Sequence, residues 1–260
     1  MFRMHPSFFV AGAQKCGTTS LFNYLIMHPC VLRPAKKEIH FFSDNYDKGM
    51  RWYLNHYPSR LKQCLQAISL RQQIVTGEAT PYYVFHPHAP ARIKKHFPDA
   101  RIIIMLRDPV ERAYSHYKYH VKLGVEDLSF EQAIEKEGER LQGEYQKMLN
   151  NEHYNSVNYK EYSYLKRGVY VEQIKRWFEL FEKESIRIFR SEDFFSDPGV
   201  VYQNVLEFLG LSSYPLKTYK RFNAGKDSEL SREAKEYLQE YYKPYNRQLN
   251  ELTGIDFQWR

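Results

Sequence analysis

A loop near the start of the chain combines two glycines, a lysine and hydroxyl side chains. It begins at Gly12 and contains Lys15 and Gly17. Three hydroxyl residues follow directly: Thr18, Thr19 and Ser20. Backbone N–H groups of such a loop, with the N-terminus of the next helix, bind phosphate oxygens. A glycine turn that only joins a strand to a helix is the alternative, and the full string favours a phosphate loop.

The position of the lysine distinguishes this loop from that of nucleoside triphosphatases. Those proteins carry lysine immediately after the second glycine, where this chain has Thr18. Lys15 lies three positions earlier, inside the loop, where a lysine reaches a different phosphate oxygen. We therefore expect Lys15 to face a leaving group.

Glu38 and His40 are candidates for proton transfer. In an extended segment alternate side chains share one face, so these two would point together. A hydroxyl that attacks as a nucleophile loses its proton, and a carboxylate or imidazole within hydrogen-bond reach can accept it. The alternative is a solvated Glu38 beside Lys36 and Lys37, with an ordinary half-buried His40.

Arg107 and Ser115 form a third candidate site. Arg107 follows an isoleucine-rich run, and Pro109 suits the first turn of the next helix. Ser115 lies about two turns into that helix, so a guanidinium and a hydroxyl could share one phosphate. The alternative is a surface ion pair at the helix start, Arg107 with Asp108 or Arg112 with Glu111.

Three later residues are weaker candidates. Tyr170 lies at the start of a predicted helix, where it could equally belong to the helix's core stripe. Arg221 and Lys226 lie in a basic loop with a glycine turn, which suits a loop that folds over a phosphate. Basic loops are also commonly just solvated.

Short apolar runs alternate with amphipathic segments along the chain. Strands are predicted at 8–11, 74–77, 101–106 and 186–189. Helices are predicted at 18–27, 89–96, 130–139, 169–181, 200–209 and 231–252. This alternation predicts an α/β fold, P-loop-like and three-layered (α/β/α), with a central mainly parallel sheet and ligands at the carboxyl ends of its strands. Residues 143–166 are polar with little periodicity, which predicts a mobile segment or lid.

The composition of the chain limits the kinds of protein to which it can belong. We expect residues 1–260 to form a single domain. Lys and Arg number 38 against 31 Asp and Glu, and the net charge of +7 favours anionic partners. Three cysteines without zinc or disulfide spacing suit a reducing compartment. No signal peptide or apolar run of membrane-spanning length is evident, so we expect no membrane span and a cytoplasmic protein.

Together these strings resemble the PAPS-dependent sulfotransferases, where PAPS is 3′-phosphoadenosine-5′-phosphosulfate. Residues 14–21 resemble the 5′-phosphosulfate loop, especially in the branch with heparan sulfate N- and 3-O-sulfotransferases and related bacterial enzymes. Residues 37–42 are similar to the family's K-E-x-H-F-F segment, and residues 107–115 to its 3′-phosphate signature. The resemblance implies PAPS as co-substrate, adenosine 3′,5′-bisphosphate as product and no metal.

The resemblance also implies residue roles. Lys15 would contact the phosphosulfate, while Glu38, or His40 after it, would be the base. Arg107 and Ser115 would bind the 3′-phosphate. The other residues implied in nucleotide binding are Gly17, Thr18, Thr19, Ser20, Tyr170, Arg221 and Lys226.

The acceptor is not implied. Heparan-type enzymes often carry a lysine where this chain has Ala79, which leaves a small metabolite or a saccharide as the expected acceptor. A P-loop kinase or triphosphatase is the main alternative, but it needs a lysine at Thr18 and a magnesium-binding carboxylate after a strand. A nucleic-acid-binding module is not expected, because the aromatic residues do not interleave with a basic stripe.

Overall fold

The computed structural model describes residues 2–220, 222 and 230–259. The chain divides into two compact units. Unit 1 comprises Met1–Leu106 and Leu180–Asn223, and unit 2 comprises Arg107–Glu179 and Ala224–Arg260. A single domain over residues 1–260 stays a prediction.

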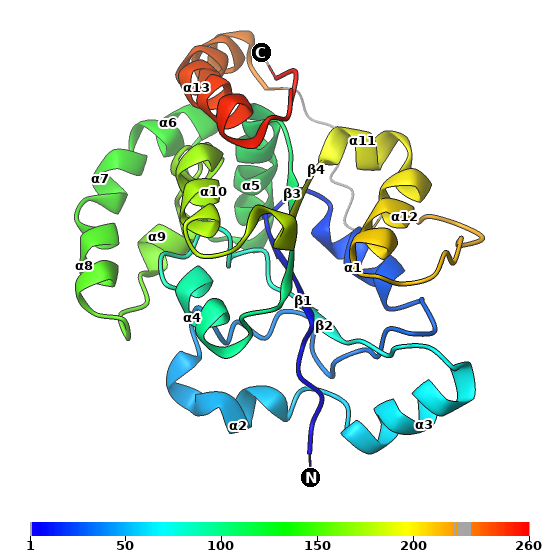
Figure 1. The fold of residues 1–260 in the computed structure, drawn as a ribbon. Coiled ribbons are helices and arrows are strands. Elements are labelled where there is room, and N and C mark those ends of the chain that lie inside the picture. Colours follow the sequence, from blue (N-terminus) through cyan, green and yellow to red (C-terminus); the bar gives the residue numbers. More distant parts are fainter. Residues whose placement is uncertain (1, 221, 223–229, 260) are drawn as a thin grey trace. The chain divides into compact units, whose positions relative to one another are not determined.

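The described part of unit 1 is built on a four-stranded parallel sheet (Figure 1). Its strands, in the order β2-β1-β3-β4, are β2 (Gly77–Ala79), β1 (Phe8–Gly12), β3 (Arg101–Leu106) and β4 (Ile186–Arg190). β1 is wholly buried, and β3 is buried apart from Arg101. Such continuous apolar runs are typical of parallel strands that are covered on both faces.

Helices cover both faces of this sheet. Phe9 of β1 packs against Phe42 and Phe97, and Phe97 directly follows α4. Figure 1 shows α4 on one side of the strands and α1 and α12 on the other. The helices of unit 1 are α1 (Thr18–Leu25), α2 (Gly49–Leu54), α3 (Arg60–Leu70), α4 (Ala89–His96), α11 (Ser191–Ser196) and α12 (Pro198–Phe208), with short 3-10 turns at Tyr46–Lys48 and Lys183–Ser185. The predicted three-layer α/β fold is confirmed.

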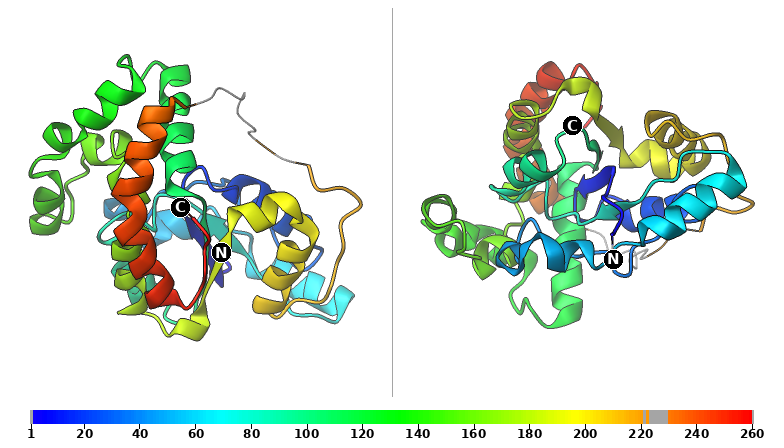
Figure 2. Two further views of the ribbon diagram at one scale, coloured as in Figure 1. Left: turned by 90° about the horizontal axis from the view of Figure 1, so that it is seen from above. Right: turned by 60° about the horizontal axis from the view of Figure 1, so that its bottom comes forward.

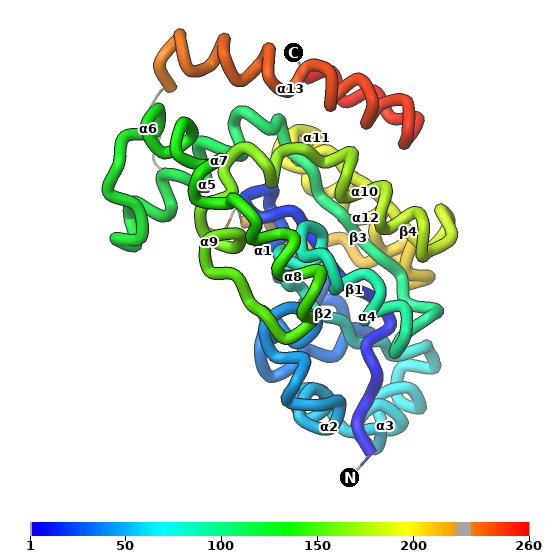
Figure 3. The backbone as a smooth tube through the Cα atoms, turned by 90° about the vertical axis from the view of Figure 1, so that its left-hand side faces the viewer, coloured from blue at the N-terminus to red at the C-terminus, as the bar shows by residue number. Residues whose placement is uncertain are grey.

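The described part of unit 2 is helical. Its helices are α5 (Pro109–Leu123), α6 (Phe130–Glu135), α7 (Glu137–Leu141), α8 (Glu144–Asn150), α9 (Val157–Glu161), α10 (Tyr170–Phe178) and α13 (Arg232–Thr253), with a 3-10 turn at Lys166–Gly168. α13 packs along α10 and α5, as Figures 2 and 3 show. Gly168 permits a close approach, because a Cβ atom there would lie 2.6 Å from the hydroxyl of Tyr242 on α13.

Three predicted elements differ from the structure. The strand expected at 74–77 begins only at Gly77, while Val75 forms an isolated bridge with Val31. The helix expected at 130–139 is divided into α6 and α7. The segment 143–166, expected to be a mobile segment or lid, contains α8 and α9. Its polar side chains hold it together, since the buried Glu144 carboxylate accepts hydrogen bonds from Tyr154 and Ser156.

Candidate active site

The glycine loop joins β1 to α1 in a tightly packed conformation. A Cβ atom on Gly12 would lie 2.1 Å from Cγ1 of Val84, so only glycine fits there. Lys15 (φ 71°) and Gly17 (φ 85°) adopt left-handed conformations. Within the described part of the chain no side chain caps the N-terminus of α1, and the first turn of this helix holds no acidic residue. Its first N–H groups have no partner within the helix, and the positive end of the helix dipole favours an anion there.

Helix α11, which follows β4, holds the glycine loop in place through contacts with Cys16 and Gly17. Ser191 donates a hydrogen bond of 2.8 Å to the carbonyl of Cys16. A Cβ atom on Gly17 would come within 3.2 Å of the rings of Phe194 and Phe195. These contacts hold the loop in one shape, with Lys15 half-buried in it.

The three hydroxyl residues of α1 have different surroundings. Thr18 and Ser20 are buried, whereas Thr19 is half-buried. The hydroxyl of Ser20 accepts a 3.0 Å hydrogen bond from the backbone of Phe222. The hydroxyl of Thr19 accepts a 2.6 Å hydrogen bond from Nζ of Lys37.

Lys37 links the phosphate loop to the second candidate site. Its Nζ atom also lies 2.8 Å from Oε1 of Glu38, so one ammonium group contacts both Thr19 and Glu38. Lys37 was not among the predicted site residues. Its neighbour Lys36 is exposed to solvent, whereas Lys37 is half-buried.

Glu38 and His40 lie close together, as expected, but the predicted extended segment is wrong. Nε2 of His40 is 3.7 Å from Oε2 of Glu38. His40 has a φ of 55°, so the chain turns there instead of extending. Contacts from elsewhere hold the turn: Asn45 donates to the carbonyl of Ile39, and Arg92 donates to the carbonyl of Phe42.

The charges around Glu38 keep it ionised. Burial alone would raise the pKa of Glu38, but its contact with the His40 imidazole and the charge of Lys37 outweigh that effect and lower the pKa to about 2. The other ring nitrogen of His40, Nδ1, lies 3.3 Å from Oγ of Ser43 and 3.6 Å from Oδ2 of Asp44. The imidazole therefore lies between two carboxylates, with its Nε2 atom toward Glu38.

A buried carboxylate supports this turn. Glu78, the central residue of β2, is fully buried, and burial raises its pKa. Four described side chains donate hydroxyl hydrogen bonds to it: Tyr53, Tyr57, Thr80 and Tyr83. The hydroxyl of Tyr83 also accepts a 3.2 Å hydrogen bond from the backbone of Phe42, which connects this network to the His40 turn. Glu78 was not among the predicted site residues; Ala79 beside it was noted only for the lysine that it replaces.

In unit 2, Arg107 lies just before α5. Its guanidinium contacts Glu111 at 3.2 Å, an ion pair at the helix start that differs from the two pairs expected there, Arg107 with Asp108 and Arg112 with Glu111. Asp108 caps the helix by accepting hydrogen bonds from the N–H groups of Val110 and Glu111. The hydroxyl of Tyr170 donates a 2.9 Å hydrogen bond to the carbonyl of Arg107. Tyr170 itself is buried, so it supports Arg107 from within unit 2.

The remaining candidates have the following positions. Ser115 is half-buried on α5. Arg112 is fully buried and donates to the carbonyl of Tyr164. Arg221 and Lys226 lie outside the described residues.

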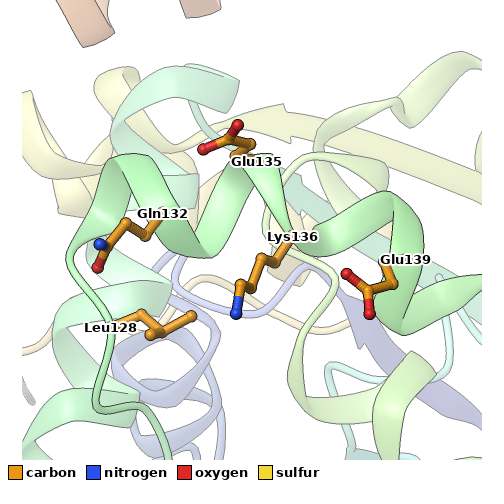
Figure 4. A pocket seen from close by; sticks show the side chains of 5 residues that line it. All are labelled: Leu128, Gln132, Glu135, Lys136 and Glu139. Atoms are coloured by element: carbon orange, nitrogen blue, oxygen red, sulfur yellow. The ribbon is translucent and has the colours of Figure 1, made fainter.

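Other features of the described residues do not add to this site. No group of three His, Cys, Asp or Glu residues that could hold a metal ion occurs among them, and none of their helices is both long and apolar enough to cross a membrane. A cavity of about 470 Å³ in unit 2 contains no predicted site residue. Figure 4 shows the side chains that line it: Leu128, Gln132, Glu135, Lys136 and Glu139. Its two carboxylates disfavour an anionic ligand.

A parallel sheet with a lysine-bearing glycine loop between its first strand and the next helix is an arrangement typical of α/β proteins that bind phosphate groups. The chain belongs to the sulfotransferase domain family, whose sequence profile matches residues 5–251. The predicted family is thereby confirmed.

The chain is similar to curated and structurally solved sulfotransferases. It is 29% identical to the membrane-associated sulfotransferase kil1 of Dictyostelium discoideum and 28% identical to human heparan sulfate glucosamine 3-O-sulfotransferase 3B1. Both alignments cover 98% of this chain, which spans 66% and 65% of the two relatives' lengths, slightly under two thirds. A crystal structure of a sulfotransferase from Alicyclobacillus acidocaldarius superposes with a TM-score of 0.72, at 32% identity and covering 97% of both chains.

Proposed function

We propose that this protein transfers the sulfonate group of PAPS to a hydroxyl of a saccharide or small-metabolite acceptor. One observation carries the proposal: Lys37 contacts both Thr19, in the first turn of the helix after the phosphate loop, and Glu38, the candidate base. A sulfonate bound at the loop would thereby lie next to a proton acceptor, which is what transfer to a hydroxyl requires. Family membership supports the same reaction.

The reaction is an in-line displacement at sulfur. The acceptor oxygen forms a bond to sulfur as the bond between sulfur and the bridging phosphate oxygen breaks. That oxygen keeps the electron pair and leaves as part of adenosine 3′,5′-bisphosphate. Lys15 stabilises the charge that develops on the leaving phosphate, and the open N-terminus of α1 adds electrostatic stabilisation to the phosphosulfate oxygens.

The proton of the acceptor hydroxyl passes to the Glu38–His40 pair. A carboxylate with a pKa of about 2 is ionised at neutral pH but is a weak base on its own. His40 lies 3.7 Å away, so the pair offers an imidazole oriented by a carboxylate as well as the carboxylate itself. The proposal assigns the proton to the pair, with Lys37 fixing the carboxylate.

The 3′-phosphate of the donor is assigned to Arg107 and Ser115 of unit 2. Arg107 is partly exposed, and its present partner Glu111 is half-exposed, so the ion pair between them is weak and can be exchanged for a phosphate. Tyr170 holds the backbone of Arg107 in place. Charge-assisted hydrogen bonds from a guanidinium suit a phosphate dianion.

The acceptor class rests on the named relatives and on one difference from them. Human 3-O-sulfotransferase 3B1 is named for heparan sulfate glucosamine, which supports a saccharide hydroxyl. At Ala79, which is fully buried, this chain lacks the lysine that heparan-type enzymes often carry. The proposal therefore places the acceptor among less strongly anionic saccharides or small metabolites.

Incubation of the purified protein with PAPS and pools of glycans and metabolites tests this proposal. Mass spectrometry should find a compound that gains a sulfonate as adenosine 3′,5′-bisphosphate forms. Lys15→Ala should abolish transfer, whereas Lys36→Ala, a change at an exposed lysine, should leave it intact; circular dichroism checks both folds. Near-normal transfer by Lys15→Ala, or magnesium-dependent ATP turnover without binding of adenosine 3′,5′-bisphosphate, would contradict the proposal.

A further inference from the structure

Helix α3 (Arg60–Leu70) presents its apolar residues to solvent. Leu61, Leu65 and Ile68 are 63%, 61% and 75% exposed, and no residue of the helix is fully buried. Leu65 follows Leu61 by four positions, and Ile68 follows Leu65 by three. The three side chains therefore form a single stripe on one helix face. In an ordinary surface helix such a stripe would face the core.

The side of α3 that contacts the protein is polar instead. Gln63 donates a 3.0 Å hydrogen bond to the carbonyl of Ile74, and Gln66 donates to the carbonyl of Pro29. Ser59 caps the helix by accepting from the N–H group of Lys62. Glutamine contacts to the backbone therefore fix the helix in an orientation that leaves its leucines outward.

Positive charge flanks the apolar stripe. At 100° per residue, Arg60 and Lys62 lie on opposite sides of Leu61, each about 100° from it. Arg71 follows at the C-terminal end of the helix. The chain has no acidic residue from Ser59 to Thr76. An apolar stripe between lysine and arginine side chains is typical of helices that lie in the surface of an anionic membrane.

A further exposed aromatic side chain adjoins the start of α3. The N–H group of Arg60 donates a 3.0 Å hydrogen bond to the carbonyl of Phe2, and Arg3 forms a β-bridge with Ser59. Phe2 is 84% exposed. Figures 1 and 3 show α3 at the edge of unit 1, next to the N-terminal segment.

We propose that α3 binds an anionic lipid surface, with Leu61, Leu65 and Ile68 in the interface and Arg60 and Lys62 at the headgroups. Charge complementarity favours this occupant over a second copy of the chain. Two copies that met through α3 would bring like charges together without any acidic partner on the helix, which is unfavourable. A bilayer with acidic headgroups offers apolar depth and negative charge together.

Vesicle sedimentation of the full-length protein tests the proposal. Binding should be strong to phosphatidylcholine vesicles that contain about a third phosphatidylserine, weak to phosphatidylcholine alone, and reduced by salt. Ile68→Gln and Leu65→Gln should each lower the partition coefficient by about tenfold. Leu123→Gln, at a comparably exposed leucine on α5, is the matched control and should not change it. Thermal unfolding checks that each variant is folded.

A fluorescent label gives a second measurement. Cys64 lies on α3 and is exposed, whereas Cys16 and Cys30 are buried, so an environment-sensitive dye can be attached to Cys64 in the native protein. Its emission should shift to the blue with anionic vesicles. Equal vesicle binding by Ile68→Gln and the wild type would overturn the proposal. So would an Ile68-dependent dimer in analytical ultracentrifugation without vesicle binding, which would assign the stripe to a second copy.

Discussion

The ammonium group of Lys37 lies 2.6 Å from the hydroxyl of Thr19 and 2.8 Å from the carboxylate of Glu38. Lys37→Met should therefore lower kcat/KM for sulfotransfer by about a hundredfold, in the range seen when a preorganised donor is removed from an active site. Lys36→Met changes the adjacent, exposed lysine and should have little effect. Equal activity of the two variants in steady-state assays would exclude a role for Lys37.

The pH profile of sulfotransfer should show no loss of activity from protonation of Glu38 near pH 4.5, the ordinary pKa of a glutamate. The pKa of Glu38 is lowered from its ordinary value of 4.5 to about 2, so its carboxylate is lost only as the pH falls toward about 2. Lys37→Met removes one of the charges that hold this pKa down, so an acid limb should move up toward the ordinary value of 4.5. An inflection between pH 4 and 5 that is the same in both proteins would contradict this assignment.

Arg107 should matter only for a donor that carries a 3′-phosphate. Arg107→Gln should raise KM for PAPS by about 10- to 100-fold, as expected for the loss of hydrogen bonds to a charged group. For adenosine 5′-phosphosulfate, which lacks the 3′-phosphate, the variant should behave like the wild type. Ser115→Ala should act in the same direction with a smaller effect. A similar loss with both donors would mean that Arg107 supports the fold rather than the 3′-phosphate.

The stability of the protein should fall as the pH rises through a window set by Glu137. This buried carboxyl group accepts hydrogen bonds from the N–H groups of Leu165 and Lys166, but burial dominates and raises its pKa from 4.5 to about 7. The folded state then holds a proton that the unfolded state releases between these two values. The Glu137 contribution to the free energy of unfolding therefore decreases by up to about 1.4 kcal/mol per pH unit over that window.

Urea unfolding at pH 5, 6, 7 and 8 measures this contribution. Glu137→Gln should flatten the decrease between pH 5 and 7, whereas Glu139→Gln, at an exposed glutamate of the same helix, should not. Identical pH profiles for the wild type and Glu137→Gln would show that the carboxyl group titrates normally.

Much of unit 1 could be predicted from the sequence because its elements carry strong local signals. The isoleucine-rich run of β3 has the predicted bounds, Arg101–Leu106, and α4 also matches, Ala89–His96. The string around Lys15 predicted the loop after β1. By contrast, α8 and α9 have little apolar periodicity, and Tyr154 and Ser156, which lie between these helices, meet Glu144 only in the folded chain.

Only part of the candidate site could be predicted, because the rest depends on contacts between residues that are distant in the sequence. Glu38 and His40 were identified, but their turn depends on Asn45 and Arg92, contacts that no local pattern reveals. Lys37 begins the K-E-x-H-F-F string, but its contacts with Thr19 and Glu38 appear only in the folded chain. The tyrosines around Glu78 come from both sides of it along the chain, so their hydroxyl groups meet only in the tertiary structure.

The hydrogen bond from Ser191 to the carbonyl of Cys16 joins residues 175 positions apart. During translation the phosphate loop emerges first, while Ser191 and β4 follow about 10 to 35 seconds later at ordinary rates of synthesis. Until then β3 lacks its β4 partner and has an open edge that can pair with other chains. Ribosome-arrested chains that end before β4 should thus be more readily cleaved by protease near Cys16 than chains that extend beyond Phe195.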